Sequence, residues 1–373
     1  MSAPGNSIPL VDLKAQFAAI GAELKEATVK ALERGDYILG GEVAEFEKEF
    51  ASYCGAKHCV AVASGTDALT LAFRALGMGP GDEAVMQANT FVATPLGVKL
   101  SGAKPVFVDA DPETMQVDLS AMEKAITPKT KALVPVHLFG QAVDMDRVMA
   151  MAKKKGIPVV EDAAQGHGAR WKGKPVGSIG DVGCWSYYPG KNLGAAGDGG
   201  ALTTNRDDIA QKLRLLRNYG STVKYVHDSF GTNSRLDTLQ AAVLRVKLKY
   251  LANWVEGRRA AARRYRELLT GIPNVVVPAL CPEEQHCWHL YVVRVPERDR
   301  VLKALQDNGV GAGIHYPIPC HVQGALKDLG YKKGDFPVSE SLADRIISLP
   351  IYAEITGEQQ KKVADELRKA VKK

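Results

Sequence analysis

Residues 184–200 read CWSYYPGKNLGAAGDGG, and the prediction of the fold starts from this segment. Its first five residues are mostly strong β-formers and predict a strand, which the following Pro-Gly pair ends. Lys191 then lies on a tight bend, and four glycines come within the next nine residues. A return strand follows over 201–204. A lysine on a rigid bend that lets other groups approach closely suits Schiff-base chemistry with a carbonyl compound. Taken alone, the segment favours the alternative, a solvated lysine at the tip of a hairpin.

The length and composition indicate a water-soluble protein of two domains. The chain has 373 residues, of which 46% are hydrophobic and 24% charged, which is ordinary for a globular protein. Its net charge of +6 is mild, and the basic residues are spread along the chain. The densest basic runs, 153–155 and 258–264, fall on expected helices, where they are typical of solvated faces. We therefore expect no nucleic-acid partner, while an anionic small substrate would suit the positive charge.

The cysteines and the N-terminus indicate where the protein works. The six cysteines include no C-x-x-C pair, and the Cys54, His58, Cys59 cluster has no second pair of ligands, so we expect no metal site. Free thiols fit a reducing cytoplasm. The N-terminus lacks a basic segment followed by an apolar core, and no run of about 18 apolar residues occurs. We therefore expect neither a signal peptide nor a membrane span.

The first two thirds of the chain alternate predicted strands and helices. After helices over 13–34 and 43–53, strands are expected over 58–63, 83–87, 105–109, 131–138 and 157–162, with helices over 67–76, 94–101, 119–126 and 145–155 between them. This order predicts a mostly parallel sheet flanked by helices. Ligands of such sheets bind at the carboxyl ends of the strands. Ser64, Phe91, Asp162 and the bend of Lys191 all lie at or just past strand ends.

A long helical pattern over 236–269 predicts a connector to a smaller C-terminal domain. We divide the chain into a large domain, 1–255, and a small domain, 256–373. The small domain is expected to contain a strand over 290–295, a helix over 298–308, a loop over 313–321, and helices over 339–347 and 358–372.

Three further features could serve a cofactor. The turn 64–66 joins a strand to a helix and could bind phosphate with free backbone N–H groups, although an ordinary N-cap by Ser64 or Thr66 is the favoured alternative. Asp162 ends a buried strand, where it could pair with a charged ring nitrogen or act as an N-cap. Phe91 could stack on a ring or belong to the core. Together with Lys191, 29 residues after Asp162, these features supply what pyridoxal 5'-phosphate (PLP) needs.

The chain resembles the DegT-type sugar-nucleotide aminotransferases, a branch of the fold type I PLP-dependent enzymes. The resemblance covers nearly the whole chain from Ile8 onward. Its most specific segments are SGTDAL at 64–69, EDAAQ at 161–165, SYYPGKNLG at 186–194 and NSRLD at 233–237. The resemblance implies a large domain with a mostly parallel seven-stranded α/β sheet flanked by helices, and a smaller α/β C-terminal domain.

The resemblance also implies roles for the cofactor-binding residues. Lys191 would hold PLP as a Schiff base and move the proton, and Asp162 would pair with the pyridine nitrogen. Gln165 would hydrogen-bond the ring hydroxyl, and Phe91 would stack on the ring. The phosphate would be held by the N–H groups of Gly65 and Thr66, the Ser186 hydroxyl and Asn233 of the neighbouring subunit. A homodimer with active sites shared across its interface is therefore implied.

The implied reaction moves an amino group from L-glutamate to a keto sugar of a nucleoside-diphosphate sugar. Some relatives have His at the Lys191 position and dehydrate, so Lys here favours transamination. The loop 313–323 resembles that of members acting on 3-keto sugars, and we favour C3 over the alternative C4. Arg235, His315 and Tyr316 would lie near the sugar and diphosphate, although His315 could be a packed loop residue. A PLP-binding regulator without turnover and a PLP lyase of small amino acids are further alternatives.

Overall fold

The computed structural model describes residues 7–372. A central sheet combines a four-stranded and a three-stranded part, which parallel bridges join at Leu133–Val159 and Val136–Asp162. The seven strands are β1 (His58–Val62), β2 (Glu83–Gln87), β3 (Lys104–Val108), β4 (Thr130–Val134), β5 (Val160–Asp162), β8 (Val182–Ser186) and β9 (Gly200–Thr204). The spatial order is β1-β9-β8-β5-β4-β2-β3. Only β9 runs antiparallel to its neighbours, so the predicted mostly parallel seven-stranded sheet is confirmed.

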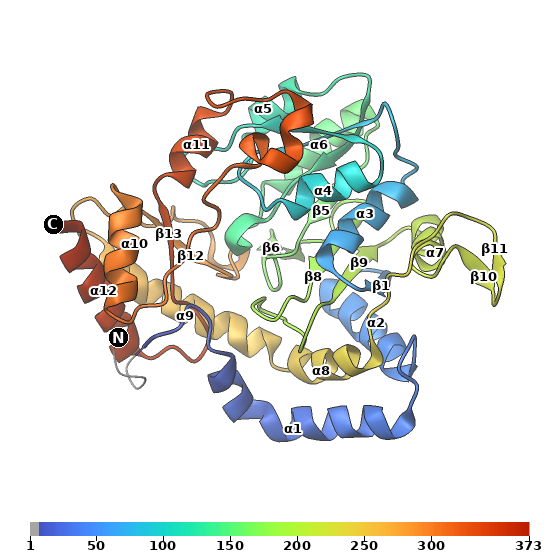
Figure 1. The fold of residues 1–373 in the computed structure, drawn as a ribbon, viewed down its shortest axis with the longest axis horizontal. Coiled ribbons are helices and arrows are strands. Elements are labelled where there is room, and N and C mark those ends of the chain that lie inside the picture. Colours follow the sequence, from blue (N-terminus) through green and yellow to red (C-terminus); the bar gives the residue numbers. More distant parts are fainter. Residues whose placement is uncertain (1–6, 373) are drawn as a thin grey trace.

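Helices cover both faces of this sheet (Figure 1). Because side chains alternate along a strand, Val60 and Val62 of β1 pack with α3, whereas Cys59 and Ala61 pack with α2 and α8. The helices of this part are α1 (Leu13–Arg34), α2 (Gly41–Cys54), α3 (Gly65–Ala75), α4 (Ala93–Leu100), α5 (Leu119–Lys124), α6 (Met145–Lys155), α7 (Asp207–Leu216) and α8 (Thr238–Leu248). The buried strands thus acquire the double cover that parallel sheets require.

The C-terminal part has a core of its own. Its elements are α9 (Leu251–Leu269), β12 (Tyr291–Arg294), α10 (Arg298–Asp307), α11 (Pro337–Ala343), β13 (Ile346–Leu349) and α12 (Gly357–Lys372). β12 and β13 pair antiparallel, and Tyr265, Val293 and Leu367 share one buried cluster. Ile8, from the other end of the chain, joins this cluster through a bridge to Val310. The boundary proposed between residues 255 and 256 falls inside α9 and stays a prediction.

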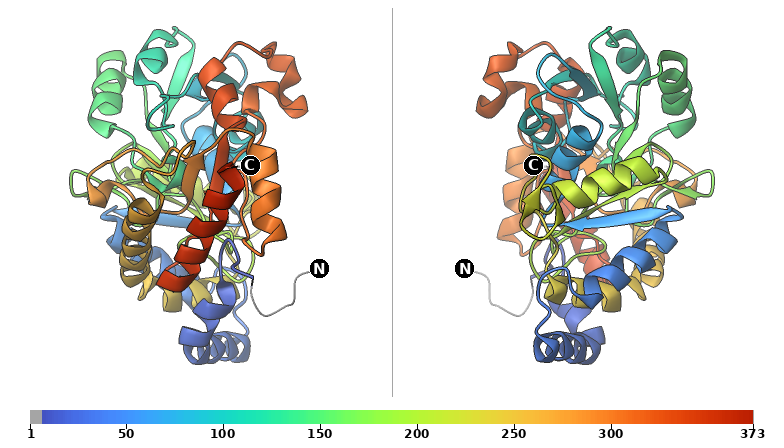
Figure 2. Two further views of the ribbon diagram at one scale, coloured as in Figure 1. Left: turned by 90° about the vertical axis from the view of Figure 1, so that its left-hand side faces the viewer. Right: turned by 90° about the vertical axis from the view of Figure 1, so that its right-hand side faces the viewer.

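Short strands and 3₁₀ turns complete the two parts. They are β6 (Arg170–Trp171), β7 (Lys174–Pro175), β10 (Ser221–Val223), β11 (Val226–His227) and the 3₁₀ turns η1 (Leu138–Gly140), η2 (Glu283–Gln285), η3 (Cys320–Val322) and η4 (Gly324–Leu329). The β10–β11 hairpin extends beyond α7 at the edge of the molecule opposite the C-terminal part (Figures 1 and 2). No helix within residues 7–372 combines the length and the apolar character needed to cross a membrane.

The predictions of two helices are wrong in detail. The long helix over 236–269 is two helices, because the N–H groups of Lys249 and Tyr250 bond to carbonyls three residues back, which tightens the chain into a turn. The helix expected over 339–347 ends at Ala343, and Ile346–Leu349 forms β13 instead. The four residues of β13 are all buried and pair with β12. A short apolar run fits a helix or a buried strand equally well, and the distant partner strand decides between them.

Candidate active site

The bend of Lys191 is held at the carboxyl edge of the sheet, just after β8. The Lys191 N–H bonds to the Tyr188 carbonyl at 2.8 Å and closes the turn. Gly194 permits this turn, since a Cβ there would lie 2.3 Å from the Pro189 carbonyl oxygen. On the other side, buried Lys247 of α8 donates to the Gly194 carbonyl at 2.8 Å. The lysine is therefore carried by a bend that the surrounding structure fixes, as the sequence suggested.

The electrostatic surroundings suit Lys191 for nucleophilic chemistry. Burial lowers the pKa of its amine to about 8, an effect that the Asp162 carboxylate opposes. His167, His289 and His315 lie close enough to Lys191 for its charge to lower their pKa values further, although burial is the larger cause for each. An amine that is partly neutral near pH 8 can attack a carbonyl carbon.

Asp162 is a buried carboxylate that accepts only uncharged donors. Thr94 Oγ1 donates to its Oδ2 at 2.7 Å, and the Ala164 N–H donates to its Oδ1 at 3.1 Å. Burial raises the pKa of Asp162, while these two donors and Lys191 lower it. Within residues 7–372 no basic side chain hydrogen-bonds to this carboxylate. A buried carboxylate needs a compensating charge, and the protonated ring nitrogen of PLP would supply it.

The start of α3 forms a small anion cup. Ser64 Oγ caps the helix by accepting the Asp67 N–H at 3.1 Å, so the simple N-cap interpretation holds for Ser64. The Gly65 and Thr66 N–H groups begin the helix and have no acceptor within it. A Cβ on Gly65 would lie 2.6 Å from Ser186 Cβ, which places the Ser186 side chain against the helix start. Two backbone donors and a hydroxyl beside a helix N-terminus fit the phosphate of PLP.

Two aromatic side chains, Phe91 and Tyr316, lie next to Gln165. Phe91 is 49% exposed, and its ring centroid lies 5.0 Å from that of Tyr316. Gln165 Nε2 donates to the Tyr316 hydroxyl at 3.1 Å, and its Oε1 accepts the Phe139 N–H at 2.5 Å. Phe91, Gln165 and Tyr316 are therefore brought together. An exposed aromatic face beside a fixed amide fits a planar ring with a polar substituent.

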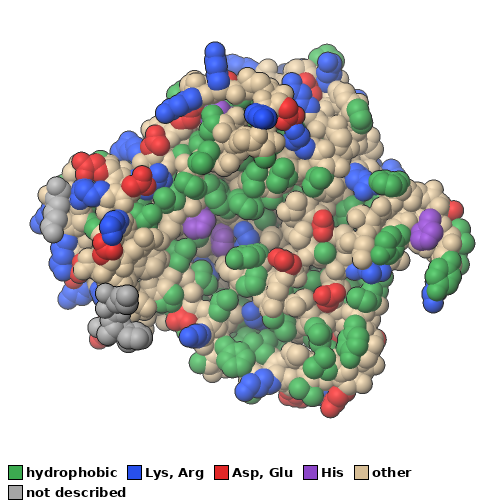
Figure 3. Space-filling view, in the orientation of Figure 1, with side chains coloured by type: hydrophobic (Ala, Val, Ile, Leu, Met, Phe, Trp, Pro, Cys, Tyr) green, Lys and Arg blue, Asp and Glu red, His purple; other side chains and the backbone are tan. Residues whose placement is uncertain are grey.

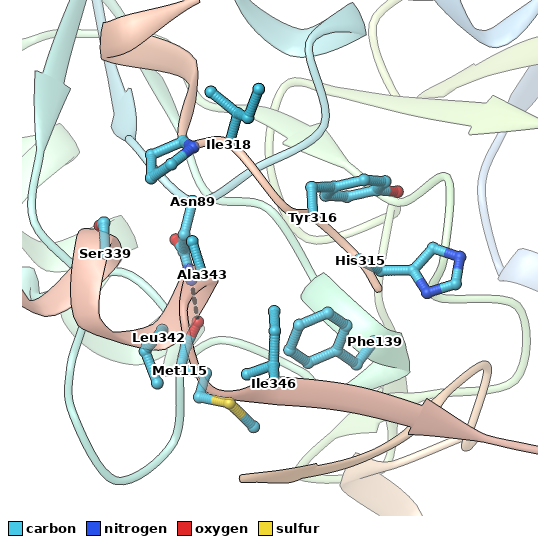
Figure 4. A pocket seen from close by; sticks show the side chains of 11 residues that line it. Asn89, Met115, Phe139, His315, Tyr316, Ile318, Ser339, Leu342, Ala343 and Ile346 are labelled. Atoms are coloured by element: carbon cyan, nitrogen blue, oxygen red, sulfur yellow. Dashed lines mark hydrogen bonds between the residues drawn. The ribbon is translucent and has the colours of Figure 1, made fainter. Parts of the chain in front are cut away.

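The loop after α10 brings His315 to the same region. His315 Nδ1 bonds to Ser348 Oγ at 2.8 Å, and burial lowers the pKa of its imidazole to about 4. His315 and Tyr316 line a small cavity together with Phe139, Leu342 and Ile346 (Figure 4). Histidine side chains are visible in the central hollow of the molecular surface (Figure 3).

Asn233 and Arg235 are not part of this cluster within one chain. Asn233 is exposed, and its backbone pairs with that of Asn218. The Arg235 guanidinium donates to Asn218 Oδ1 at 3.0 Å and lies 5.5 Å from the centre of the Tyr219 ring. Within the described chain, neither side chain hydrogen-bonds to Lys191, Asp162 or Gln165.

The sequence did not reveal several residues of the site. Thr94 contacts Asp162 directly, and its place in the first turn of a helix that follows a strand is a signal that could have suggested it. His289 is buried beside Lys191, and Arg258, which lines a small pocket together with Lys191, bonds to the carbonyls of Trp288 and Ile351 at 3.0 Å each. These two residues come from the C-terminal part of the fold, and nothing in their local sequence marks them.

Comparison with known proteins places these features in a family. The model of the DegT/DnrJ/EryC1/StrS aminotransferase family matches residues 18–368. The chain is 44% identical to the dTDP-3-amino-3,4,6-trideoxy-alpha-D-glucose transaminase of Streptomyces venezuelae, over 97% of this chain and 95% of that protein. It is 45% identical to the dTDP-3-amino-3,6-dideoxy-alpha-D-galactopyranose transaminase of Aneurinibacillus thermoaerophilus, over 97% and 99%. A relative from Geobacillus stearothermophilus, 42% identical over 97% of this chain and 98% of that protein, is instead named a pleiotropic regulatory protein.

A solved structure supports the same conclusion. S. venezuelae DesV, in complex with a ketimine intermediate, matches with a TM-score of 0.96 and 44% identity, over 98% of this chain and 99% of that chain. A shared sheet order alone would show only the fold. Sequence identity at this level over the full length shows more: the chain belongs to the DegT/DnrJ/EryC1/StrS family of PLP-dependent aminotransferases.

Proposed function

We propose that this enzyme transfers the amino group of L-glutamate to C3 of a 3-keto sugar carried by a nucleoside diphosphate. The observation that carries the proposal is the position of His315 and Tyr316, whose loop meets the Gln165 and Phe91 side of the site. Relatives named as transaminases of 3-amino sugars support the choice of C3 over C4. The Tyr316 ring and the His315 imidazole, whose pKa burial lowers to about 4, would offer uncharged groups to a hexose on this side of the site.

In this proposal the residues of the chain bind, orient and move protons. Lys191 would hold PLP through its side-chain amine and, as a free amine, would accept and return the proton at the Cα of glutamate. Bound PLP supplies an electron sink for the bond that breaks at Cα. Asp162 would pair with the ring nitrogen, Gln165 would bond the ring hydroxyl, and Phe91 would stack on the ring. The Gly65 and Thr66 N–H groups and the Ser186 hydroxyl hold the phosphate.

Kinetics with a panel of keto-sugar nucleotides test the substrate. Matched pairs of 3-keto and 4-keto hexoses, each linked to dTDP, UDP or GDP, are supplied with glutamate, and 2-oxoglutarate release is measured. We expect the highest kcat/KM with a 3-keto member. A higher kcat/KM for the 4-keto partner of every pair would overturn the C3 assignment. PLP uptake without turnover on any member would favour a regulatory role.

We further propose that the enzyme is a homodimer whose sites use Asn233 of the neighbouring subunit to hold the phosphate, with Arg235 near the sugar diphosphate. Two features support this: the Asn233 side chain is exposed, and it lies near the projecting β10–β11 hairpin rather than in its own chain's Lys191 cluster. The hairpin region also exposes Tyr225 and Phe230, 82% and 87% respectively, which a partner could cover. We place the enzyme in the cytoplasm, because its six cysteines are free thiols.

Subunit complementation tests the shared site. Lys191→Ala cannot form the Schiff base, and Asn233→Asp with Arg235→Ala places a negative charge against the phosphate and weakens substrate binding. In a mixed dimer both defects can fall on one composite site and leave the other intact. Co-refolding should restore about half of the wild-type activity per mixed dimer, or about a quarter overall for random pairing across a two-fold interface.

A matched pair serves as the control for complementation. Lys191→Ala co-refolded with Asp162→Asn should stay inactive, because both residues belong to one chain's half of the site. If the first mixture is as inactive as its components while mixed dimers demonstrably form, Asn233 and Arg235 act in their own subunit or have a structural role.

A further inference from the structure

A chain of two buried threonine hydroxyls ends on the Asp162 carboxylate. Thr94 Oγ1 lies 2.7 Å from Asp162 Oδ2 and 2.8 Å from Thr90 Oγ1. Thr90 and Thr94 are only 2% and 0% exposed, so water does not replace either contact. Neither threonine has a role in the function proposed above.

The direction of these hydrogen bonds follows from counting protons. A hydroxyl has one proton to donate. An ionised carboxylate has none, so Thr94 donates to Asp162 Oδ2. Thr94 can then only accept from Thr90, whose hydroxyl must donate to it. The Ala164 N–H donates to the other carboxylate oxygen at 3.1 Å. Each oxygen of Asp162 therefore has a donor, and this arrangement matches the ionised form.

The same hydroxyls are tied to other parts of the site. The Thr94 N–H bonds to the Phe91 carbonyl at 3.1 Å, so the turn that carries Phe91 also carries Thr94. The Thr90 carbonyl accepts the Cys320 thiol at 3.1 Å, and Cys320 N–H bonds to the Ala88 carbonyl at 2.8 Å. The segment 88–94 thus connects the loop of His315 with Asp162.

We propose that Thr94 is a positioning residue that orients the Asp162 carboxylate toward the ring nitrogen of PLP and keeps it ionised, and that Thr90 fixes the direction of the Thr94 hydroxyl. The proposal rests on the assignment of Asp162 to the ring nitrogen. Thr94 itself does not contact the cofactor in this arrangement and acts through Asp162.

The proposal predicts a dependence on pH. The groups that face Asp162 are Lys191 from the bend after β8, His137 from the segment after β4, Cys184 of β8 and Tyr316 of the loop after α10. Of its hydrogen bonds, those from Thr94 and Ala164 lower the pKa of Asp162 against the effect of burial. Without Thr94 the pKa of Asp162 rises further, so the carboxylate loses its charge at a higher pH. A variant lacking the hydroxyl should therefore be increasingly defective as the pH falls.

The test compares Thr94→Val, which keeps the shape but removes the hydroxyl, with Thr94→Ser, which keeps the hydroxyl. The apoprotein of each variant is titrated with PLP, and the affinity is read from the absorbance of the bound cofactor between about pH 6 and 9. Because a hydrogen bond to a charged group contributes more free energy than one between neutral groups, Thr94→Val should bind PLP ~10- to 100-fold more weakly at neutral pH. The deficit should grow toward pH 6, and Thr94→Ser should restore most of the affinity.

Thr204→Val is the matched control, because Thr204 is a buried threonine whose hydroxyl donates to the Asp181 carbonyl at 2.7 Å, away from the site. It should lower thermal stability and leave PLP affinity unchanged. Wild-type affinity and pH profile in Thr94→Val, or a Thr94→Ser variant no better than Thr94→Val, would overturn the proposal. If Thr94→Val does not fold, Thr90→Val decides, with a smaller deficit of the same pH dependence supporting the proposal and wild-type behaviour overturning it. Unchanged PLP affinity in Asp162→Asn would refute the assignment of Asp162 itself.

Discussion

Replacing Asp162 with asparagine separates the charge of the carboxylate from its shape. The side-chain oxygen of asparagine can still accept the Ala164 N–H, whose present distance to Oδ1 is 3.1 Å. Its amide would meet Thr94 Oγ1 as a donor, so the Thr94 hydroxyl would have to turn away. The change therefore removes the negative charge that we place opposite the ring nitrogen and reverses one hydrogen bond, but removes almost no volume.

The change should affect PLP affinity much more than it affects the stability of the apoprotein. Removing one partner of a buried charge pair costs about 3–5 kcal/mol, which corresponds to a PLP affinity about 100- to 4,000-fold weaker. The stability of the apoprotein should change much less. Burial raises the pKa of Asp162, so ionisation of this group lowers the free energy of unfolding as the pH rises from its unfolded-state pKa to its folded-state pKa. Asparagine avoids that cost but exchanges a charge-assisted hydrogen bond for a neutral one, a loss of about 1 kcal/mol, so the two effects partly cancel.

The assay measures both quantities on one preparation. PLP titration of the apoprotein gives the affinity, urea denaturation of the same apoprotein gives the free energy of unfolding, and glutamate half-reaction rates give turnover. We expect a small change in unfolding free energy beside losses of orders of magnitude in PLP affinity and turnover. Near-wild-type turnover with glutamate in the variant would refute the role of Asp162. A large loss of apoprotein stability would show that the carboxylate is structural.

Three other predictions concern Lys191 and the anion cup at the start of α3. Borohydride reduction of the yellow PLP-bound protein should fix the cofactor to Lys191, and peptide mapping that finds it on another lysine would contradict the assignment. Because burial lowers the pKa of the Lys191 amine to about 8, its labelling by PLP in the apoprotein should rise with pH to a midpoint near that value, whereas exposed lysines titrate about two pH units higher. Gly65→Ala would place a Cβ 2.6 Å from Ser186 Cβ, so it should cost about 1–3 kcal/mol of unfolding free energy and weaken PLP binding. Gly79→Ala, whose Cβ would meet nothing within 4 Å, is its control, and equal effects of the two would show that the cup is not tightly packed.

Local sequence was sufficient to predict the elements that carry the site. Strand β2 and helices α1 and α6 occupy the predicted residues, because each has a clear period and a clear stop, such as the left-handed Gly35 after α1 and Gly156 after α6. The order of strands and helices then predicted which edge of the sheet would carry Ser64, Asp162 and Lys191. These predictions needed no knowledge of distant contacts.

Contacts between segments far apart in sequence could not be predicted in the same way. β13 is recognisable only through β12, more than fifty residues earlier. The break between α8 and α9 contains neither glycine nor proline, so no residue marks it. Thr94 reaches Asp162 across 68 residues, and the Gln165 amide bonds the Tyr316 hydroxyl across 151. In each case the residue type allows several partners, and tertiary packing selects one.

The glycines after Lys191 act through their size rather than through backbone freedom. None of Gly194, Gly197, Gly199 and Gly200 has a positive φ, so an alanine could adopt the backbone of each. A Cβ at Gly194 would meet the Pro189 carbonyl oxygen at 2.3 Å, and one at Gly200 would meet the Ser64 carbonyl oxygen at 2.3 Å. Backbone atoms cannot yield as a flexible side chain does, so substitution at either position must move the Lys191 bend or the start of α3. Gly194 thus lets the Lys191 bend close on Pro189, and Gly200 lets β9 lie against the residue that caps α3, so the two glycines shape the two places where we propose that the cofactor is held.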